Sequence, residues 1–245
     1  MVVITLPTYN EEATLPLLLL AIRESMRENQ IEYRVLVVND GSIDRTAEVA
    51  SRMSSEMPLA VIEHGENRGL GEAIRTGLMA AIEDADDLDI IVTMDSDNTH
   101  TPGLIARMVR GIREGNDVVI ASRYRQGAHI KGVPRYRRLL SFGARIAFSI
   151  LFPTPNVRDF TSGFRAYRAG VLKQAFDTYG EEFVAQSGFS CMVDILLKLR
   201  RLGAIMSEVP LILRYDQKFG ASKMMVMRTI KDTLRLIVSR RIGLR

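Results

Sequence analysis

The chain of 245 residues has one cysteine, no tryptophan and no long apolar run. Cys191 cannot form a disulfide within the chain, which fits a reducing compartment. The longest apolar run, 15–22, contains Pro16 and is far shorter than the ~20 residues that cross a bilayer. The N-terminus also lacks the basic start of a signal peptide. We therefore expect a cytoplasmic protein without membrane spans, whose contact with lipid, if it has one, is peripheral.

Acidic residues are missing from one stretch of the chain. No Asp or Glu lies between Asp117 and Asp159, whereas eight Arg or Lys residues do. Residues 1–117 carry a net charge of −11 and residues 118–245 carry +15. This asymmetry indicates a surface that meets an anion, which could be nucleic acid, a phosphorylated ligand or a membrane face. Nucleic acid is disfavoured, because aromatic residues, which should interleave with the basic ones, make up only 7% of the chain.

Short runs rich in Val and Ile alternate with longer segments of helical period in the first 121 residues. The predicted strands are 2–5, 33–39, 59–63, 90–94 and 118–121, and the predicted helices are 14–29, 44–56, 70–84 and 102–114. Continuous apolar strands separated by helices are typical of a mostly parallel sheet covered on both faces. The pattern predicts an α/β fold with a Rossmann-like central sheet flanked by helices.

The second half is less regular. Helices are predicted at 139–152, ended by Pro153 and Pro155, and at 188–202. Strands are predicted at 164–167, 205–209 and 211–214, with Pro210 between the last two. The final segment, 224–245, is predicted to be an amphipathic basic helix. We expect a single domain over 1–223, composed of the halves 1–121 and 122–223, followed by this helix.

Polar residues follow four of the predicted strands where each strand ends, at 7–11, 39–42, 95–97 and 122–124. In a doubly wound sheet, ligands bind at this edge. Asp95 and Asp97 come directly after an apolar strand, and two carboxylates at this spacing can converge on Mg²⁺ or Mn²⁺. The alternative is a solvated acidic turn, or a cap for the helix that begins near 102.

The segment Asn67-Arg68-Gly69-Leu70-Gly71 opens a predicted helix. Glycines at a helix N-terminus let backbone N–H groups approach an anion. The segment has neither the G-x-G-x-x-G spacing nor a G-K-S/T ending, which counts against NAD-binding and P-loop readings. A plain glycine turn before a helix is the alternative interpretation.

Five segments recur in one order: Leu6-Pro-Thr-Tyr-Asn-Glu11, Val37-Val-Asn-Asp-Gly-Ser-Ile-Asp-Arg-Thr46, Asn67-Arg-Gly-Leu-Gly71, Asp95-Ser-Asp97 and Asp159-Phe-Thr-Ser-Gly-Phe164. Through them the chain resembles family-2 glycosyltransferases of the GT-A fold. Further segments make it similar to the dolichol-phosphate (polyprenyl-phosphate) mannosyltransferase group within that family. These are Ser122-Arg-Tyr124, Arg137-Arg138 with Ser141, the 159–168 block, Glu208-Val-Pro210 and Gly220-Ala-Ser-Lys223. The resemblance extends from residue 2 to about residue 235.

The resemblance implies roles for individual residues. The predicted donor-binding set is Pro7, Tyr9, Glu11, Asp40, Gly69, Asp95, Ser96, Asp97, Arg214, Ser222 and Lys223. Asp95 and Asp97 would hold Mg²⁺ or Mn²⁺ against the diphosphate. The predicted acceptor-binding set is Arg123, Arg137, Arg138 and Ser141. The predicted catalytic residues are Asp97, Arg123 and Asp194. Residues 1–121 would then form the nucleotide-sugar half and residues 122–223 the acceptor half.

Four positions depart from the family pattern. Asn39 stands where an aspartate is common, and Arg145 replaces a frequent asparagine. Thr99 stands where the narrower group often has a third metal-side ligand. Asp194 is one methylene shorter than the family's glutamate and is the only candidate base nearby; a carboxylate that is paired or at the helix surface is the alternative.

The implied reaction is direct displacement at the anomeric carbon with inversion, moving mannose from GDP-mannose to a polyprenyl or dolichyl phosphate. An ionised phosphate acceptor needs no general base, and the acid-free segment offers cations and no base. The alternatives are a UDP-sugar donor such as UDP-glucose, or a soluble acceptor. A nucleotide-binding regulator without catalysis is disfavoured, because both carboxylates of 95–97 are present.

Overall fold

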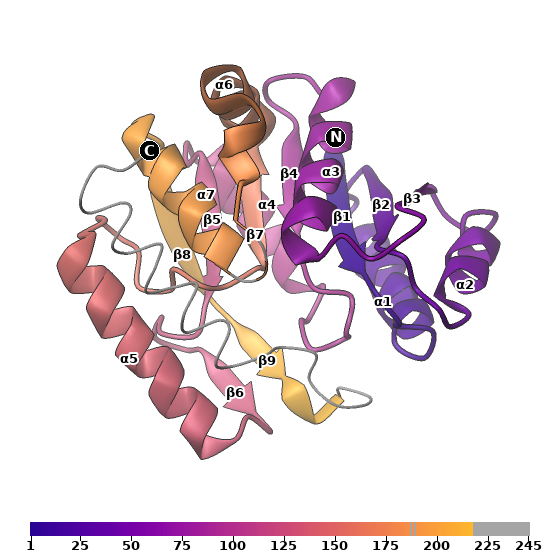
Figure 1. Ribbon diagram of the computed structural model, residues 1–245, viewed down its shortest axis with the longest axis horizontal. Helices are drawn as coiled ribbons and strands as arrows, with labels where there is room; N and C mark the ends of the chain where they lie inside the picture. Colours follow the sequence, from indigo (N-terminus) through magenta and orange to yellow (C-terminus); the bar gives the residue numbers. More distant parts are fainter. Residues whose placement is uncertain (187, 189, 218–245) are drawn as a thin grey trace.

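A seven-stranded sheet forms the centre of the molecule in the computed structural model, which describes residues 1–186, 188 and 190–217 (Figure 1). The strands are β1 (Val2–Thr8), β2 (Tyr33–Asn39), β3 (Leu59–Glu63), β4 (Ile90–Thr93), β5 (Val118–Ser122), β7 (Arg165–Arg168) and β8 (Met206–Pro210). Their order across the sheet is β3-β2-β1-β4-β7-β5-β8. A separate two-stranded sheet pairs β6 (His129–Lys131) with β9 (Ile212–Arg214).

Seven helices are described: α1 (Leu15–Glu28), α2 (Thr46–Met53), α3 (Leu70–Glu83), α4 (Leu104–Arg113), α5 (Arg135–Leu151), α6 (Ala169–Tyr179) and α7 (Ser190–Arg201). Two short 3₁₀ segments, η1 (Gly180–Val184) and η2 (Tyr215–Gln217), complete the described chain. Within this part of the chain, no helix combines the length and the apolarity that crossing a membrane requires.

The central sheet is parallel except at β7. This strand runs antiparallel to both of its neighbours, with Val92 opposite Ala166 and Val119 opposite Ala166. β5 then pairs in parallel with β8, so that the last strand of the first half is completed only by strands from the second half. The sheet is therefore shared between the two halves.

Each face of the sheet packs against its own helices because alternate strand residues point to opposite sides. Val3, Leu36 and Ile91 belong to a core that includes apolar residues of α3, α6 and α7 and Phe148 of α5. Val2, Ile4 and their equivalents belong to the core under α1, α2 and α4. Both faces are covered, as the continuous apolar strands predicted, and α5 lies at one side of the molecule (Figure 1).

Most of the predicted elements are confirmed with boundaries shifted by a few residues. The helix predicted at 139–152 begins four residues earlier, at Arg135, and ends at Leu151, before Pro153. The helix α6 and the short strand β6 were not predicted. Ser222, Lys223 and the predicted helix 224–245 lie outside the described residues.

Candidate active site

The loops that follow β1 and β2 are hydrogen-bonded to each other. The backbone N–H of Asn10 donates to Ser42 Oγ (2.9 Å), and Ile43 N–H donates to Asn10 Oδ1 (2.9 Å). Asn10 has a φ of 52°, a left-handed conformation that asparagine tolerates well. Glu11, which is predicted to bind the sugar donor, lies in the same loop. Its N–H donates to Thr46 Oγ1 (2.8 Å), and its carboxylate accepts from the Thr14 hydroxyl. The two loops form one unit at the carboxyl edge of the sheet.

Asp40 anchors the glycine turn instead of facing solvent. Its Oδ1 accepts from Arg68 N–H (2.9 Å) and its Oδ2 from Gly69 N–H (2.8 Å). His64, which the sequence did not single out, lies with Nδ1 2.8 Å from Asp40 Oδ1 and Nε2 2.9 Å from Thr76 Oγ1. The N–H groups of Arg68 and Gly69 are thus taken by a carboxylate of the chain itself. These contacts match the alternative of a plain glycine turn, and a donor-binding role of Gly69 stays a prediction.

A neighbouring glycine permits this arrangement. Gly41 has a φ of 68°, and a β-carbon there would stand 2.3 Å from the carbonyl carbon of Glu66. The turn after β2 and the segment before α3 therefore approach each other at a distance that only glycine allows.

The Asp95-Ser96-Asp97 segment is tied to β1 and to the residues that follow it. Ser96 is buried and donates from Oγ to the carbonyl of Pro7 (2.9 Å), which joins two of the predicted donor-binding segments. Asp97 Oδ1 accepts from Thr99 Oγ1 (2.7 Å) and from Thr99 N–H (3.2 Å). Thr99 therefore fixes the rotation of the Asp97 carboxylate. The side chain of Asp95 remains 35% exposed.

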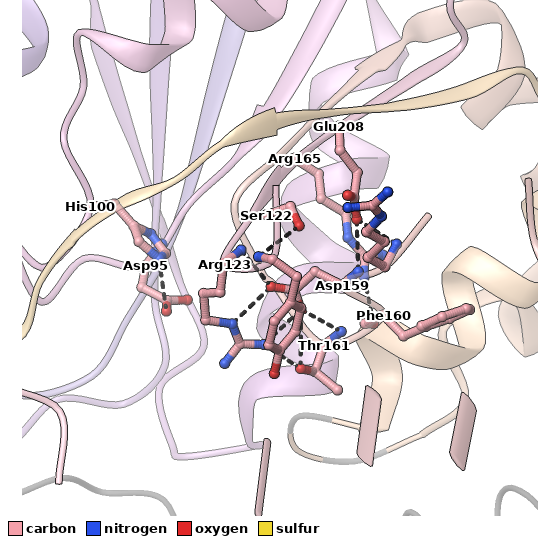
Figure 2. Close-up of polar contacts among 11 residues, drawn as sticks. Asp95, His100, Ser122, Arg123, Asp159, Phe160, Thr161, Arg165 and Glu208 are labelled. Atoms are coloured by element: carbon pink, nitrogen blue, oxygen red, sulfur yellow. Dashed lines mark hydrogen bonds and ion pairs between the residues drawn. The ribbon is translucent and has the colours of Figure 1, made fainter. Parts of the chain in front are cut away.

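His100 supports the same segment from beneath. It is buried, its ring stacks on Phe164 with centroids 5.0 Å apart, and its Nδ1 accepts from Asp95 N–H (3.3 Å). An Nδ1 that accepts leaves the proton of a neutral imidazole on Nε2, which lies 3.9 Å from Asp95 Oδ2. Figure 2 shows this pair beside the Arg123 cluster.

Strand β9 contacts the loop that contains Asp95, Asp97 and His100. Arg214 N–H donates to the carbonyl of Thr99 (2.8 Å), and His100 forms an isolated bridge with Leu213. The Arg214 guanidinium forms two hydrogen bonds with Asp216 (3.0 and 3.1 Å), which also pairs with Lys131 of β6 (3.2 Å). These contacts hold the pKa of Asp216 at about 2, chiefly through the Arg214 hydrogen bonds. Arg214, which is predicted to bind the sugar donor, thus lies next to the loop that carries Asp95 and Asp97 (the carboxylate loop). Its guanidinium, however, is paired with Asp216.

Arg123, at the end of β5, is held by Asp159 (Figure 2). Its Nε donates to Asp159 Oδ2 (2.8 Å) and its Nη2 to Asp159 Oδ1 (2.6 Å), and its backbone N–H also donates to Oδ2 (3.0 Å). Thr161 Oγ1 accepts a further bond from Nη2 (2.5 Å). Asp159 is completely buried, whereas 20% of the Arg123 side chain is exposed.

The charge state of this pair follows from its contacts. Burial by itself would raise the pKa of Asp159, but attraction to Arg123 and hydrogen bonds from it outweigh burial, and the pKa lies below 3.8. The pKa of Arg123 is raised, because the Asp159 charge outweighs the opposing effect of burial. The ion pair is therefore intact at neutral pH.

Asp194 lies in the core and not at an accessible surface. Its Oδ2 accepts from Lys198 Nζ (2.7 Å) one helical turn along α7, and both side chains are buried. Lys198 also donates to the carbonyls of Glu182 and Phe183. This carboxylate is buried and paired with Lys198, and a catalytic role of Asp194 stays a prediction. The alternative of a paired carboxylate holds, with lysine as the partner.

The predicted acceptor residues Arg137, Arg138 and Ser141 lie on α5. The helix approaches the β5 end through Arg145, whose guanidinium carbon lies 4.8 Å from the centroid of the Tyr124 ring. Phe148 packs into the core with Phe152 and Phe160. Large apolar side chains are exposed along the rest of the helix: Tyr136, Leu139, Leu140, Phe142, Ile146 and Ile150.

The loop that contains Asp95 and Asp97 offers two carboxylates as ligands for a divalent metal. A β-carbon at Gly163 would stand 3.2 Å from Asp95 Oδ1, so the glycine keeps the space beside this oxygen open. Among the described residues, no group of three or more His, Cys, Asp or Glu side chains is placed to hold a metal ion. Two carboxylates match Mg²⁺, which proteins commonly bind through one or two carboxylates together with substrate phosphates.

Comparison with known proteins identifies the family. The model of "Glycosyl transferase family 2" matches residues 3–176. The chain belongs to glycosyl transferase family 2. This family-2 glycosyltransferase is 34% identical over 196 residues to the dolichol-phosphate mannosyltransferase of Pyrococcus furiosus, covering 80% of the chain and 52% of that protein. It is 33% identical over 220 residues to the undecaprenyl-phosphate mannosyltransferase of Micrococcus luteus, covering 89% of the chain and 85% of that protein.

Solved structures place the glycosyltransferase in the GT-A fold. Glucosyl-3-phosphoglycerate synthase from Mycobacterium tuberculosis, in complex with Mn²⁺, UDP and glucosyl-3-phosphoglycerate, superimposes with a TM-score of 0.69 at 20% identity. The match covers 100% of this chain and 81% of the synthase. The same synthase with Mg²⁺ and UDP also gives a TM-score of 0.69. The predicted fold class is confirmed. The chain spans about half the length of the Pyrococcus relative.

Proposed function

We propose that this glycosyltransferase moves mannose from GDP-mannose to a polyprenyl or dolichyl phosphate, with inversion at the anomeric carbon. The names of the two mannosyltransferase relatives support the sugar and the lipid phosphate. The observation that carries the proposal is the acid-free segment between Asp117 and Asp159, which joins the strand edge at Arg123 to the basic start of α5. That segment matches an anionic acceptor.

Each side of the site has its own task in this proposal. Asp95 and Asp97 would hold Mg²⁺ or Mn²⁺, which supplies positive charge to the departing diphosphate. Arg123, Arg137 and Arg138 bind and orient the acceptor phosphate. Because its oxygens are ionised near neutral pH, the phosphate attacks the anomeric carbon without a general base, which is consistent with the pairing of Asp194 to Lys198.

The exposed apolar side chains of α5 support a peripheral contact with the cytoplasmic face of a membrane. Leu139, Phe142, Ile146 and Ile150 recur at helical spacing on one stripe, and the helix begins with three arginines, Arg135, Arg137 and Arg138. Apolar side chains beside basic ones are characteristic of helices that lie in a membrane interface. Such a contact would bring the lipid phosphate to Arg123.

A donor and acceptor panel tests the proposal. GDP-mannose, GDP-glucose, UDP-glucose and UDP-mannose are each incubated with the full chain and Mg²⁺ or Mn²⁺, with and without polyprenyl phosphate, and released nucleoside diphosphate is measured. We expect the fastest release from GDP-mannose, and only when polyprenyl phosphate is present. Faster release from UDP-glucose with a soluble phosphorylated acceptor such as 3-phosphoglycerate would contradict the proposal and favour the alternative activity.

A further inference from the structure

Glu208 is bonded to the 158–159 backbone, next to the residue that holds Arg123, and takes no part in the proposed chemistry. It is on β8, opposite Ile120 of β5, and is only 8% exposed. Its Oε1 accepts two backbone hydrogen bonds, from Arg158 N–H (2.6 Å) and from Asp159 N–H (2.7 Å). Its Oε2 is buried and has no hydrogen-bond partner among the described residues. The two oxygens of one carboxyl group therefore have very different surroundings.

The two backbone bonds to Glu208 determine where the Asp159 side chain points. Asp159 in turn contacts Arg123 through the Nε, Nη2 and backbone N–H groups of that residue. The chain of contacts thus runs from β8 through the 158–159 backbone to a guanidinium at the edge of β5 (Figure 2). Arg123 can present its charge in one orientation only while each contact in the series is made.

We propose that Glu208 is a positioning residue for Arg123, and that it acts as a hydrogen-bond acceptor through Oε1 and not through negative charge. The inference rests on the proposed role of Arg123 at the acceptor phosphate. A negative charge at Glu208 would leave Oε2 buried and unpartnered, next to the ionised Asp159. Burial raises the pKa of Glu208 and the Asp159 charge adds to that effect, whereas the backbone hydrogen bonds from 158 and 159 and an interaction with the Ser122 hydroxyl oppose it. A neutral carboxyl group, with its proton on Oε2, makes the same two bonds through Oε1 without a buried negative charge.

Substitutions at Glu208 separate the two roles. Glu208→Gln keeps an acceptor oxygen without charge, whereas Glu208→Ala removes both. Glu83→Gln, on an exposed glutamate at the end of α3, is the matched control. We expect Glu208→Gln and the control to keep the KM for polyprenyl phosphate within about twofold, and Glu208→Ala to raise it about tenfold or more, with the KM for the nucleotide sugar unchanged in all three.

The NMR signal of the Arg123 Nε–H group, assigned by its loss in Arg123→Lys, reports the position of the guanidinium independently of activity. It should shift in Glu208→Ala and stay in place in Glu208→Gln. If Glu208→Gln displaces the signal or raises the acceptor KM tenfold, the acceptor-only role is wrong, even if the alanine variant does not fold. If a folded Glu208→Ala leaves the signal unmoved, Glu208 does not position Arg123.

Arg123→Ala separates this inference from the proposed function. If that variant keeps the wild-type acceptor KM, then Arg123 does not bind the acceptor phosphate and the proposed role is wrong. The NMR result for the Glu208 variants would still decide whether the relay exists.

Discussion

Asp97 illustrates how neighbouring groups fix the orientation of a proposed metal ligand. The hydroxyl and the N–H of Thr99 both donate to its Oδ1, so this carboxylate has a defined orientation at the strand edge. The sequence showed Thr99 only as a departure from the usual third metal-side ligand. In the structure, Thr99 contributes by orienting the Asp97 carboxylate through its hydroxyl and its N–H group. A residue whose side chain binds the metal directly could not make this contact in the same way.

Removing the Asp97 carboxylate should abolish most transfer activity. We expect Asp97→Ala to lower kcat by about 100-fold or more even at saturating Mg²⁺ or Mn²⁺, since loss of an outer-shell partner alone often costs 10–100-fold. The rate of nucleoside diphosphate release measures this. Asp84→Ala, an exposed aspartate beyond the end of α3, serves as the control and should behave as wild type. Full activity of Asp97→Ala would show that the metal assignment is wrong.

The raised pKa of Glu208 predicts a specific dependence of stability on pH. As pH rises above the ordinary value of 4.5, the unfolded chain releases this proton before the folded protein does, and the free energy of unfolding falls. Glu208→Gln has no proton to release. Its stability relative to wild type should therefore increase between pH 4.5 and the folded pKa, with a slope of at most about 1.4 kcal/mol per pH unit.

Urea unfolding of both proteins between pH 4 and pH 8 measures the difference. Asp159 titrates in both proteins, so its opposite effect, a loss of stability as pH falls through its lowered pKa, cancels in the comparison. A difference that is constant over this range would mean that the folded protein does not hold the Glu208 proton more tightly than the unfolded chain does.

At the scale of elements, α7 carries a buried ion pair one turn apart, Asp194–Lys198. We expect Asp194→Ala to lower the free energy of unfolding by about 3–5 kcal/mol, because it leaves a buried ammonium group without its counter-charge. Replacing both residues, as Asp194→Leu with Lys198→Met, should restore most of this stability. Urea denaturation of the three proteins measures it.

The same double variant tests the catalytic role of Asp194. If Asp194 only pairs with Lys198, the folded double variant should keep kcat within a few-fold of wild type. A loss of 100-fold or more in a protein of normal stability would indicate that Asp194 acts as the general base, since general-base catalysis contributes about 10²–10⁴-fold.

Local pattern predicted the elements well where burial is two-sided and periodic. The runs that became β2 and β3 have the predicted bounds, since each is a short apolar segment between turn residues. The direction of β7 could not be predicted, because a strand of four residues carries no signal for its partner's orientation. The same limit applies to the site: its strand-end segments were found, whereas the pairings Asp40–His64 and Asp159–Glu208 join residues 24 and 49 positions apart.

At the scale of the whole molecule, α5 gives the protein one side that differs from the rest. Leu139 and Ile150 are 72% and 73% exposed on a helix whose first turn is basic. Transferring an apolar side chain of this size from water contributes about 1.5–3 kcal/mol, and each nearby Lys or Arg adds on the order of 1 kcal/mol at an anionic surface. These contributions would favour the proposed reversible contact with a membrane.

The variant Leu139→Ser/Ile150→Ser should therefore bind anionic vesicles at least about tenfold more weakly than wild type, measured by co-flotation. The control is Ile43→Ser/Leu88→Ser, which removes two apolar side chains that are even more exposed, at 88% and 79%, from loops elsewhere in the chain. Wild-type binding should also weaken as salt is raised. Equal losses in the two double variants would show that α5 is not the membrane-facing side.

The strand order has a consequence for how the protein is made. β4 gains its second neighbour only when β7, at 165–168, is available, and β5 gains its parallel neighbour only at 206–210. When residues 1–122 have left the ribosome, the carboxylate loop and the end of β5 are present, but the strands that hold them side by side have not yet been made. Residues 1–121 come first in the chain, but their part of the sheet is completed only by later strands, so a fragment that ends at residue 121 should not fold as a separate module.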